Sequence, residues 1–235
     1  IWIFGGSTSN KGFCDSKKLS WVDFLETKLK VKNFSKNGVY SNYSLNILHH
    51  QLQYEKPEAI IWANKVNEIL YSKRQEGIKN VFLKNIQSIK KTFKSNSVFF
   101  YFSDEIILRI FDKLGFNLRI ENSDLSNKTY SIASNNFYKN SKKAIELAKI
   151  NNIYKFYIVS LFNEKNIKNK ENVFFQYYMD KVFKLTNEYN FVKFINTKNF
   201  LNQNDKEKIL FCDPMHQTLE GKILTGKIIS KEIND

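Results

Sequence analysis

The sequence has little proline, glycine and cysteine, and it has no long hydrophobic run. Only 2 prolines and 8 glycines occur among 235 residues, so proline-rich linkers are absent and a single domain is expected. No run of about 18 apolar residues is present, so nothing in the sequence predicts a membrane-spanning helix. The 2 cysteines are too few for a disulfide scaffold, and neither has a spacing typical of a metal site. Nucleotide-binding motifs are absent as well, so we expect neither a metal nor a cofactor.

Positive charge is what the chain has in excess, with a net charge of +14. Such an excess can attract nucleic acid, an acidic glycan or an anionic membrane surface. However, the lysines are scattered, and the residue types that AT-rich codons favour (Lys, Asn, Ile, Phe and Tyr) are all abundant. Unclustered charge is a weak sign of a partner, so we do not expect nucleic-acid binding. A membrane surface stays an alternative partner through the basic charge, and the oligomeric state stays open.

The first residues resemble the inside of a strand, and no initiator methionine precedes them. No signal peptide is visible. We therefore expect that an N-terminal segment, which could act as a signal or an anchor, has been removed or left out. Localisation stays open between the cytoplasm, export and membrane anchoring.

Short apolar runs alternate with segments of helical periodicity, which predicts a parallel sheet covered by helices on both faces. We expect the fold class to be a three-layer α/β/α sandwich with a mostly parallel, flavodoxin-like sheet. The predicted strands cover residues 1–4, 31–34, 59–63, 154–162 and 191–195. The predicted helices are one that contains Trp21, Phe24, Leu25 and Leu29, followed by 41–54, 140–151, 171–190 and 218–233.

One stretch, residues 70–135, does not follow this alternation. It contains a basic helical pattern at 80–94, an aromatic run at 98–102 and another helical pattern at 104–114. We interpret it as a mainly helical insertion within one domain, 1–235. Because it begins shortly after Asn67, we expect it beside the crevice that binds the ligand. The alternative is that its aromatic run packs against the domain.

Four residues near the C-terminus, Asp213-Pro214-Met215-His216, place a carboxylate three positions before one of only 3 histidines. In hydrolytic triads, a histidine takes the proton of a serine, while a carboxylate orients the imidazole and stabilises its charged form. The pair therefore predicts a general base and its partner. An ordinary surface loop at the start of a helix is the alternative interpretation.

A candidate nucleophile, Ser7, stands at the opposite end of the chain. It follows Gly5-Gly6 directly after the first predicted strand, where a tight turn would expose its hydroxyl. Ligands of an open parallel sheet bind in the crevice at the carboxyl ends of the strands. The N-terminus of the following helix could help to hold negative charge there. A plain Gly-Ser turn is the alternative.

Two further segments that follow strand ends could donate hydrogen bonds to an oxyanion. Gly38, at the end of the stretch 33–38, lets the backbone approach a ligand closely and offer its N–H. Asn67 can donate from its side-chain amide. It could also cap a helix that has Glu68 in its first turn, and the two interpretations are compatible. Asn64 lies close in sequence and is the alternative donor.

Together these segments resemble the SGNH, or GDSL-like, hydrolase family. The family's first block is matched by Gly5-Gly6-Ser7-Thr8 and its second by residues 33–38. Its third block is matched by Val66-Asn67-Glu68, and its last by Asp213-Pro214-Met215-His216 followed by Gly221. A single block carries little information, whereas the set in this order is specific.

The resemblance implies a serine esterase that works through an acyl-enzyme. Ser7 would be the nucleophile, His216 the general base and Asp213 the orienting partner. The oxyanion hole would consist of the N–H of Ser7, the N–H of Gly38 and the side chain of Asn67. No metal or cofactor takes part in such a mechanism.

The chain departs from the family pattern at two places. Ser35 and Asn37 stand where glycines are frequent in the second block, which could narrow or reshape the crevice. Glu68 follows Asn67 where Asp is commoner. Neither departure removes a catalytic group.

The implied substrate is a small-molecule or glycan ester, either an acyl or acetyl group on a carbohydrate or a lipid-like ester. An O-acyltransferase on the same fold is an alternative, because it needs the same first half-reaction. A catalytically inactive basic domain that binds a glycan or another polyanion is a second alternative.

The two cysteines flank the predicted catalytic groups. Cys14 lies seven residues after Ser7, and Cys212 lies four before His216. If the triad forms, both segments converge on one crevice, so a disulfide between the cysteines is geometrically allowed. The alternative is a pair of reduced, buried thiols.

Overall fold

The computed structural model describes residues 1–11, 14, 18–64, 67–68, 127–161, 173–201, 209–213 and 216–234. The patterns at 80–94, 98–102 and 104–114, which we interpret as parts of an insertion, lie outside the described residues. The expectation that they lie beside the crevice therefore stays a prediction.

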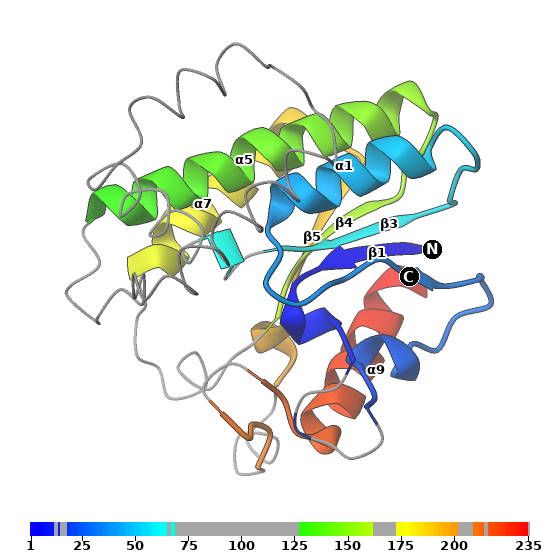
Figure 1. The fold of residues 1–235 in the computed structure, drawn as a ribbon, viewed down its shortest axis with the longest axis vertical. Helices are drawn as coiled ribbons and strands as arrows, with labels where there is room; N and C mark the ends of the chain where they lie inside the picture. The colour runs from blue at the N-terminus through cyan, green and yellow to red at the C-terminus, as the bar shows by residue number, and fades with distance from the viewer. Residues whose placement is uncertain are drawn as a thin grey trace, which may run out of the picture.

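Five parallel strands form one sheet in the order β2-β1-β3-β4-β5. The strands are β1 (Trp2–Gly5), β2 (Lys32–Asn33), β3 (Ile60–Ala63), β4 (Phe156–Ser160) and β5 (Val192–Asn196). This is the flavodoxin-like order of doubly wound sheets, which have helices on both faces. Figure 1 shows these layers, and the predicted three-layer α/β/α class is confirmed.

The central strands are buried along their whole length, which explains their continuous apolar sequences. All residues of β1, β3 and β4 are buried, whereas β5, at the edge of the sheet, alternates buried with more exposed positions. Successive side chains of a strand point to opposite faces. Trp62 accordingly belongs to one hydrophobic core and Ile61 to the other.

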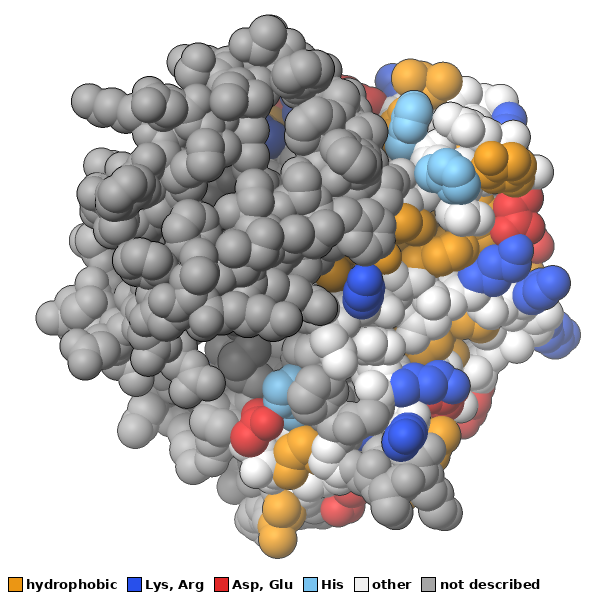
Figure 2. Space-filling view, viewed as in Figure 1, with side chains coloured by type: hydrophobic (Ala, Val, Ile, Leu, Met, Phe, Trp, Pro, Cys, Tyr) orange, Lys and Arg blue, Asp and Glu red, His pale blue; other side chains and the backbone are white. Residues whose placement is uncertain are grey.

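Each face of the sheet is covered by its own set of helices (Figure 1). On one face lie α1 (Ser41–Gln51), α5 (Asn127–Ile150) and α7 (Val173–Glu188). On the other lie the 3-10 turn η2 (Trp21–Phe24) and α9 (Leu219–Asn234). No helix in the described part of the chain has the length and hydropathy needed to cross a membrane. On the face seen in Figure 2, lysine side chains lie at several separate places, in keeping with their scatter in the sequence.

The first predicted helix is wrong, because only the single 3-10 turn η2 forms there. Ser20 and Asp23 cap this turn reciprocally, and Leu25 already has an extended backbone. The next residue, Glu26, donates its backbone N–H to the Ser230 hydroxyl of α9 at 2.7 Å. A tertiary partner thus replaces the helical hydrogen bond, while Leu25 and Leu29 still pack on the core.

The helix predicted at 140–151 begins earlier, at Asn127. Residues 127–135, which we assigned to the insertion, therefore belong to α5. This segment is rich in Asn and Ser, which have low helix propensity. Tertiary packing overrides that preference, because Ala133 and Phe137 are fully buried against the same core as the rest of the helix.

Candidate active site

The parallel pairing of β1 with β3 brings two of the predicted site segments to one edge of the sheet. Gly5 pairs with Ala63, so the residues that follow each strand emerge side by side. The backbone beyond β2 continues this arrangement, because the N–H of Lys36 donates to the carbonyl of Gly5 at 3.2 Å. The crevice at the carboxyl ends of the strands therefore receives segments from all three strands.

Ser7 begins a 3-10 turn, η1 (Ser7–Ser9), directly after β1. The turn closes through hydrogen bonds from the N–H of Ser9 to the Gly6 carbonyl and from the N–H of Asn10 to the Ser7 carbonyl, at 3.1 and 3.2 Å. Ser7 remains partly exposed. The predicted exposed serine is therefore present, on a 3-10 turn.

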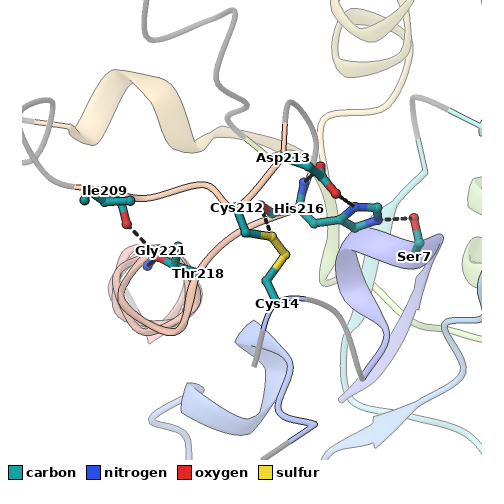
Figure 3. The surroundings of a disulfide bond; sticks show 8 residues. All are labelled: Ser7, Cys14, Ile209, Cys212, Asp213, His216, Thr218 and Gly221. Carbon is teal, nitrogen blue, oxygen red and sulfur yellow. Dashed lines mark hydrogen bonds and ion pairs between the residues drawn. A yellow bond between two sulfur atoms is a disulfide. The ribbon is translucent and has the colours of Figure 1, made fainter. Parts of the chain in front are cut away.

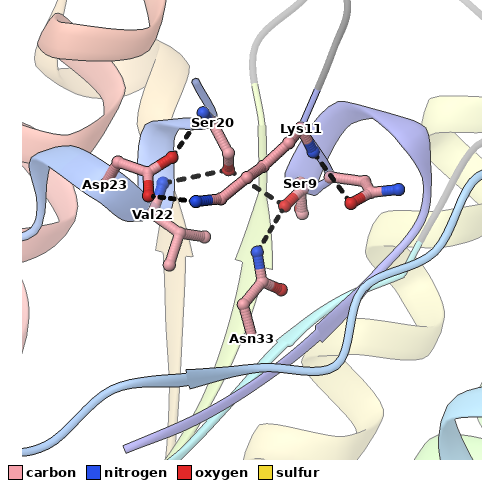
Figure 4. Close-up of polar contacts among 7 residues, drawn as sticks. Ser9, Lys11, Ser20, Val22, Asp23 and Asn33 are labelled. Atoms are coloured by element: carbon pink, nitrogen blue, oxygen red, sulfur yellow. Dashed lines mark hydrogen bonds and ion pairs between the residues drawn. The ribbon is translucent and has the colours of Figure 1, made fainter. Parts of the chain in front are cut away.

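Ser9 anchors this turn to its surroundings (Figure 4). Its carbonyl accepts hydrogen bonds from the Asn33 amide at 2.9 Å and from the Ser20 hydroxyl at 3.0 Å. Its hydroxyl accepts one from the Trp21 indole N–H at 3.1 Å. Because Ser9 is buried and bonds to three partners, it fixes the backbone of the turn that carries Ser7.

His216 joins Ser7 and Asp213 in one line of contacts (Figure 3). The Nε2 atom lies 3.2 Å from the Ser7 Oγ, and Nδ1 lies 2.6 Å from the Asp213 Oδ2. An ionised carboxylate only accepts hydrogen bonds, so Nδ1 carries the proton and Nε2 is left to accept the proton of Ser7. The three residues that the sequence proposes as a triad thus come together, and their catalytic roles stay predictions.

Asp213 holds both the ring and the backbone of His216. Besides its contact with Nδ1, its Oδ1 accepts the backbone N–H of His216 at 2.7 Å. The N–H of Cys212 donates to the carbonyl of His216 at 3.1 Å, and Phe211 and Gln217 form an antiparallel bridge. His216 and Asp213 therefore lie in a small hairpin that is closed by these bonds, which restrict rotation of the imidazole.

Thr218 ties this hairpin to the start of α9 (Figure 3). Its hydroxyl donates to the Ile209 carbonyl at 2.8 Å, and its backbone N–H donates to the Leu210 carbonyl at 3.0 Å. The same hydroxyl accepts the N–H of Gly221 at 3.3 Å and so caps the helix. Gly221, which follows the last block of the resemblance, packs directly on the Leu210 carbonyl.

A disulfide between Cys14 and Cys212 links the segment after η1 to the hairpin of His216 (Figure 3). Their Cα atoms are 5.9 Å apart, within the range of disulfides. Of the two states considered from the sequence, the structure has the bridge. Cys14, Cys212 and Asp213 lie close enough together to hold a metal, but bridged sulfurs are not the thiolates that bind one.

Asn67 lies against the residue that precedes the candidate nucleophile. A Cβ at Gly6 would overlap the Asn67 Nδ2, so only glycine allows this approach. One N–H of the amide donates to the Val39 carbonyl at 2.5 Å. The other has no partner among the described residues, so it can serve a ligand.

Gly38 lies at the exposed end of the second block and has φ +71°. No atom lies near the position of a Cβ there, so the positive φ, and not lack of space, requires glycine. The amide of Asn10, just after η1, donates to the Asn37 Oδ1 at 2.9 Å and ties this loop to the nucleophile's turn. The donation of the Gly38 N–H to an oxyanion stays a prediction.

Asn64, the alternative donor, is turned toward α1. Its Oδ1 accepts the Ser44 hydroxyl at 3.1 Å, and its Nδ2 is buried without a partner in the described part of the chain. The Asn67 amide lies beside Gly6, just before the turn of Ser7, whereas the side-chain hydrogen bond of Asn64 goes to Ser44 of α1. This arrangement favours Asn67 as the donor.

Glu68 has a role that the sequence analysis misses. It is fully buried, and its Oε1 accepts the backbone N–H of Ser41, the first residue of α1, at 2.5 Å. Burial raises the pKa of Glu68 to about 7, although hydrogen bonds from the Ser41 hydroxyl and N–H act in the opposite direction. One signal was available, because the N-cap of α1 is Tyr40, which offers no capping side chain.

Several solved structures resemble this chain over nearly its whole length. A lipolytic protein of the G-D-S-L family from Veillonella parvula has a TM-score of 0.59 at 14% identity, with 98% of this chain and 95% of that chain covered. A psychrotrophic esterase from a Pseudoalteromonas species, inhibited by monoethylphosphonate, has a TM-score of 0.57 at 11% identity, covering 100% and 98%. A lipase/acylhydrolase from Enterococcus faecalis has a TM-score of 0.55 at 13% identity, covering 99% and 93%.

No model of a protein family matches the sequence, and no curated protein does. At these identities the likeness to solved structures shows the fold. The expectation drawn from the four sequence blocks is confirmed at that level: the chain has the α/β/α fold of the G-D-S-L lipolytic proteins.

We expect the Cys14→Ser/Cys212→Ser variant to be less stable than the native protein. The bridge spans a sequence separation of 198 residues, and closing so long a loop stabilises by up to about 5 kcal/mol in the entropy model. Urea unfolding measures the loss in free energy when three samples are compared: the native protein, the native protein in dithiothreitol and the double variant. Dithiothreitol should leave the double variant unchanged. Alkylation of both cysteines in native protein without reductant would contradict the bridge.

We also expect Glu68 to make the free energy of unfolding depend on pH. Its pKa rises from 4.5 to about 7 on folding, so the folded protein holds this proton more tightly than the unfolded chain. The contribution of Glu68 to the free energy of unfolding is fully present below pH 4.5. It falls by on the order of 3 kcal/mol as the pH rises to about 7. Urea unfolding of native protein and Glu68→Gln across this window measures the effect. Equal slopes in the two proteins would contradict it.

Proposed function

We propose that this chain, which has the fold of the SGNH hydrolases, is a serine esterase that works through an acyl-enzyme. The observation that carries the proposal is the line of contacts from Asp213 through His216 to Ser7. It lies at the carboxyl ends of parallel strands, where ligands of such sheets bind. An inactive polyanion-binding domain has no need of this arrangement.

In the first step, the Ser7 Oγ attacks the carbonyl carbon of the ester, and His216 Nε2 takes the hydroxyl proton. The imidazole becomes positively charged, and the Asp213 carboxylate, 2.6 Å from Nδ1, stabilises that charge. Because Asp213 also holds the backbone of His216, the ring is already oriented before the substrate binds.

The negative charge that develops on the substrate oxygen needs donors that are in place in advance. The N–H of Ser7, the N–H of Gly38 and the remaining N–H of the Asn67 amide would supply them. The amide is fixed by its bond to the Val39 carbonyl, so little reorganisation accompanies the reaction.

The tetrahedral intermediate collapses when its bond to the alcohol oxygen breaks and His216 returns the proton to the leaving alcohol. Water then attacks the acyl group on Ser7 while His216 takes a proton from it. The second tetrahedral intermediate collapses when its bond to the Ser7 Oγ breaks, His216 returns the proton to that oxygen, and the carboxylic acid leaves. Each half-reaction uses the same base and the same oxyanion donors.

The substrate class that we propose is an acylated carbohydrate or a lipid-like ester. The structural neighbours are described as a lipolytic protein, an esterase and a lipase/acylhydrolase, which favours hydrolysis. An O-acyltransferase would pass the same acyl group to a sugar hydroxyl in place of water. Measuring acetyl release with and without a sugar acceptor separates the two, because only transfer yields an acetylated acceptor.

We expect Ser7→Ala to abolish turnover of 4-nitrophenyl acetate, with a loss in kcat on the order of 10³–10⁶ fold, because the nucleophile is gone. A fluorophosphonate probe should label the native protein at Ser7 and leave the variant unlabelled. Thr186→Ala is the control, because it removes a hydroxyl that bonds to the Phe183 carbonyl within α7, and it should keep activity. Full esterase activity in folded Ser7→Ala would refute the assignment.

Asn67→Ala should lower kcat by about 10²–10³ fold, because one oxyanion donor is lost. It should also lower the free energy of unfolding by about 1–2 kcal/mol, since the buried bond to Val39 disappears. Asn64→Ala removes a buried asparagine of the same region and should lower stability without a large loss in kcat. If Asn64→Ala shows the large loss in kcat and Asn67→Ala does not, the donor is Asn64.

A further inference from the structure

Two consecutive side chains hold the backbone between the second block and α1. The Asn67 amide bonds to the Val39 carbonyl at 2.5 Å, and the Glu68 carboxyl bonds to the Ser41 N–H at 2.5 Å. Gly38 comes immediately before this held segment, 39–41. Segment 39–41 therefore connects two of the three proposed oxyanion donors, because Gly38 precedes it in the chain and Asn67 is hydrogen-bonded to it.

Glu68 serves as the cap that α1 lacks in its own sequence. The first N–H groups of a helix have no intrahelical partners, and a carboxylate there is favoured by the helix dipole. Tyr40, at the N-cap, provides no side-chain bond. A serine at that position would cap the helix without burying an acid. The cap comes instead from the residue next to Asn67, which joins the start of α1 to the oxyanion donor.

The position of Glu68 is fixed from a third element as well. The Asn140 amide of α5 donates to the Ser41 hydroxyl at 2.9 Å, so α5 helps to fix the residue whose N–H Glu68 accepts. The other carboxyl oxygen of Glu68 is buried and has no partner among the described residues. Within the described part of the chain, Glu68 is therefore held through Ser41, and its loss acts directly on the first turn of α1.

We propose that Glu68 is a positioning residue of the oxyanion hole, which fixes the start of α1 and thereby the spacing between the Gly38 N–H and the Asn67 amide. The proposal rests on the esterase function proposed above. Oxyanion donors act only when they lie about 2.7–3.1 Å from the charged oxygen. A displacement of about 1 Å can lower the rate by on the order of 10² fold.

Three variants separate positioning from stability. Glu68→Ala removes the bond to the Ser41 N–H, whereas Glu68→Gln keeps an acceptor oxygen in the same place. Ser141→Ala is the matched control, because its buried hydroxyl accepts the Trp62 indole N–H at 3.0 Å on the same side of the sheet and, within the described structure, makes no bond to the oxyanion segments. Both Ala variants should lower the urea midpoint.

The readout is kcat and KM for 4-nitrophenyl acetate. We expect Glu68→Ala to lower kcat by about 10–10² fold with little change in KM, because donor geometry matters most in the transition state. Glu68→Gln should keep kcat within about threefold of the native protein, and Ser141→Ala should behave in the same way. If Glu68→Ala does not fold, Glu68→Asp replaces it, because the shorter side chain withdraws the carboxyl from Ser41 and should lower kcat.

A double-mutant cycle with Asn67→Ala tests the route of the effect. If Glu68 acts through the hole, Glu68→Ala should cost much less in kcat when Asn67 is already Ala than in the native background. Ser141→Ala should have the same small effect in both backgrounds. Additive losses for Glu68→Ala and Asn67→Ala, or a kcat for Glu68→Ala equal to that of Ser141→Ala, would overturn the proposal.

The same measurements distinguish this proposal from the function on which it rests. A native protein that turns over the ester and is labelled at Ser7, together with an unchanged kcat in Glu68→Ala, refutes only the role of Glu68. A native protein that neither turns over esters nor reacts with the fluorophosphonate probe refutes the esterase, and the positioning role with it.

Discussion

The parallel register of β1 and β3 is the constraint on which the candidate site depends. Gly5 pairs with Ala63, so the turn of Ser7 and the segment of Asn67 leave the sheet at the same height. A shift by one residue would turn the strands' side chains to the opposite faces and separate the two segments. The register is fixed because both faces of these strands are buried in apolar cores. Hydrophobic packing thus determines where the polar groups meet.

The candidate nucleophile and the candidate base are held by different physical means. Ser7 sits on a turn that is fixed by backbone pairing and by the buried Ser9, whereas His216 lies 209 residues away in a hairpin outside the sheet. No ladder of a sheet fixes that hairpin. Hydrogen bonds between Asp213 and His216 hold the hairpin together, and the disulfide from Cys212 ties the hairpin to the segment that follows Ser7. A covalent link supplies the restraint that the sheet gives to the other segments.

The sequence predicts the strands well, because buried parallel strands leave unbroken apolar runs. It also predicts that Ser7, Asp213 and His216 come together, because their order and spacing match the blocks of the family that the chain resembles. It predicts less well where tertiary contacts decide. The helix expected through Leu29 shortens to a turn because Ser230 takes the N–H of Glu26. The α5 helix starts before its periodicity is convincing because Phe137 and Ala133 are buried. The cap from Glu68 is missed because it comes from a segment 27 residues away, and Tyr40, which cannot cap α1, shows only that a cap is needed.

The polar groups that follow β3 support a functional site at this edge independently of the line from Asp213 to Ser7. Asn64, Asn67 and Glu68 are all buried, and Asn64 and Glu68 each bury an atom that lacks a partner in the described structure. Leaving such an atom unpaired costs about 1–3 kcal/mol, so a fold selected for stability alone would place apolar residues there. The strand just before them, β3, does consist of buried apolar residues. The change from apolar to buried polar side chains therefore occurs where the backbone reaches the crevice, which is where oxyanion donors must be held rigidly and away from water.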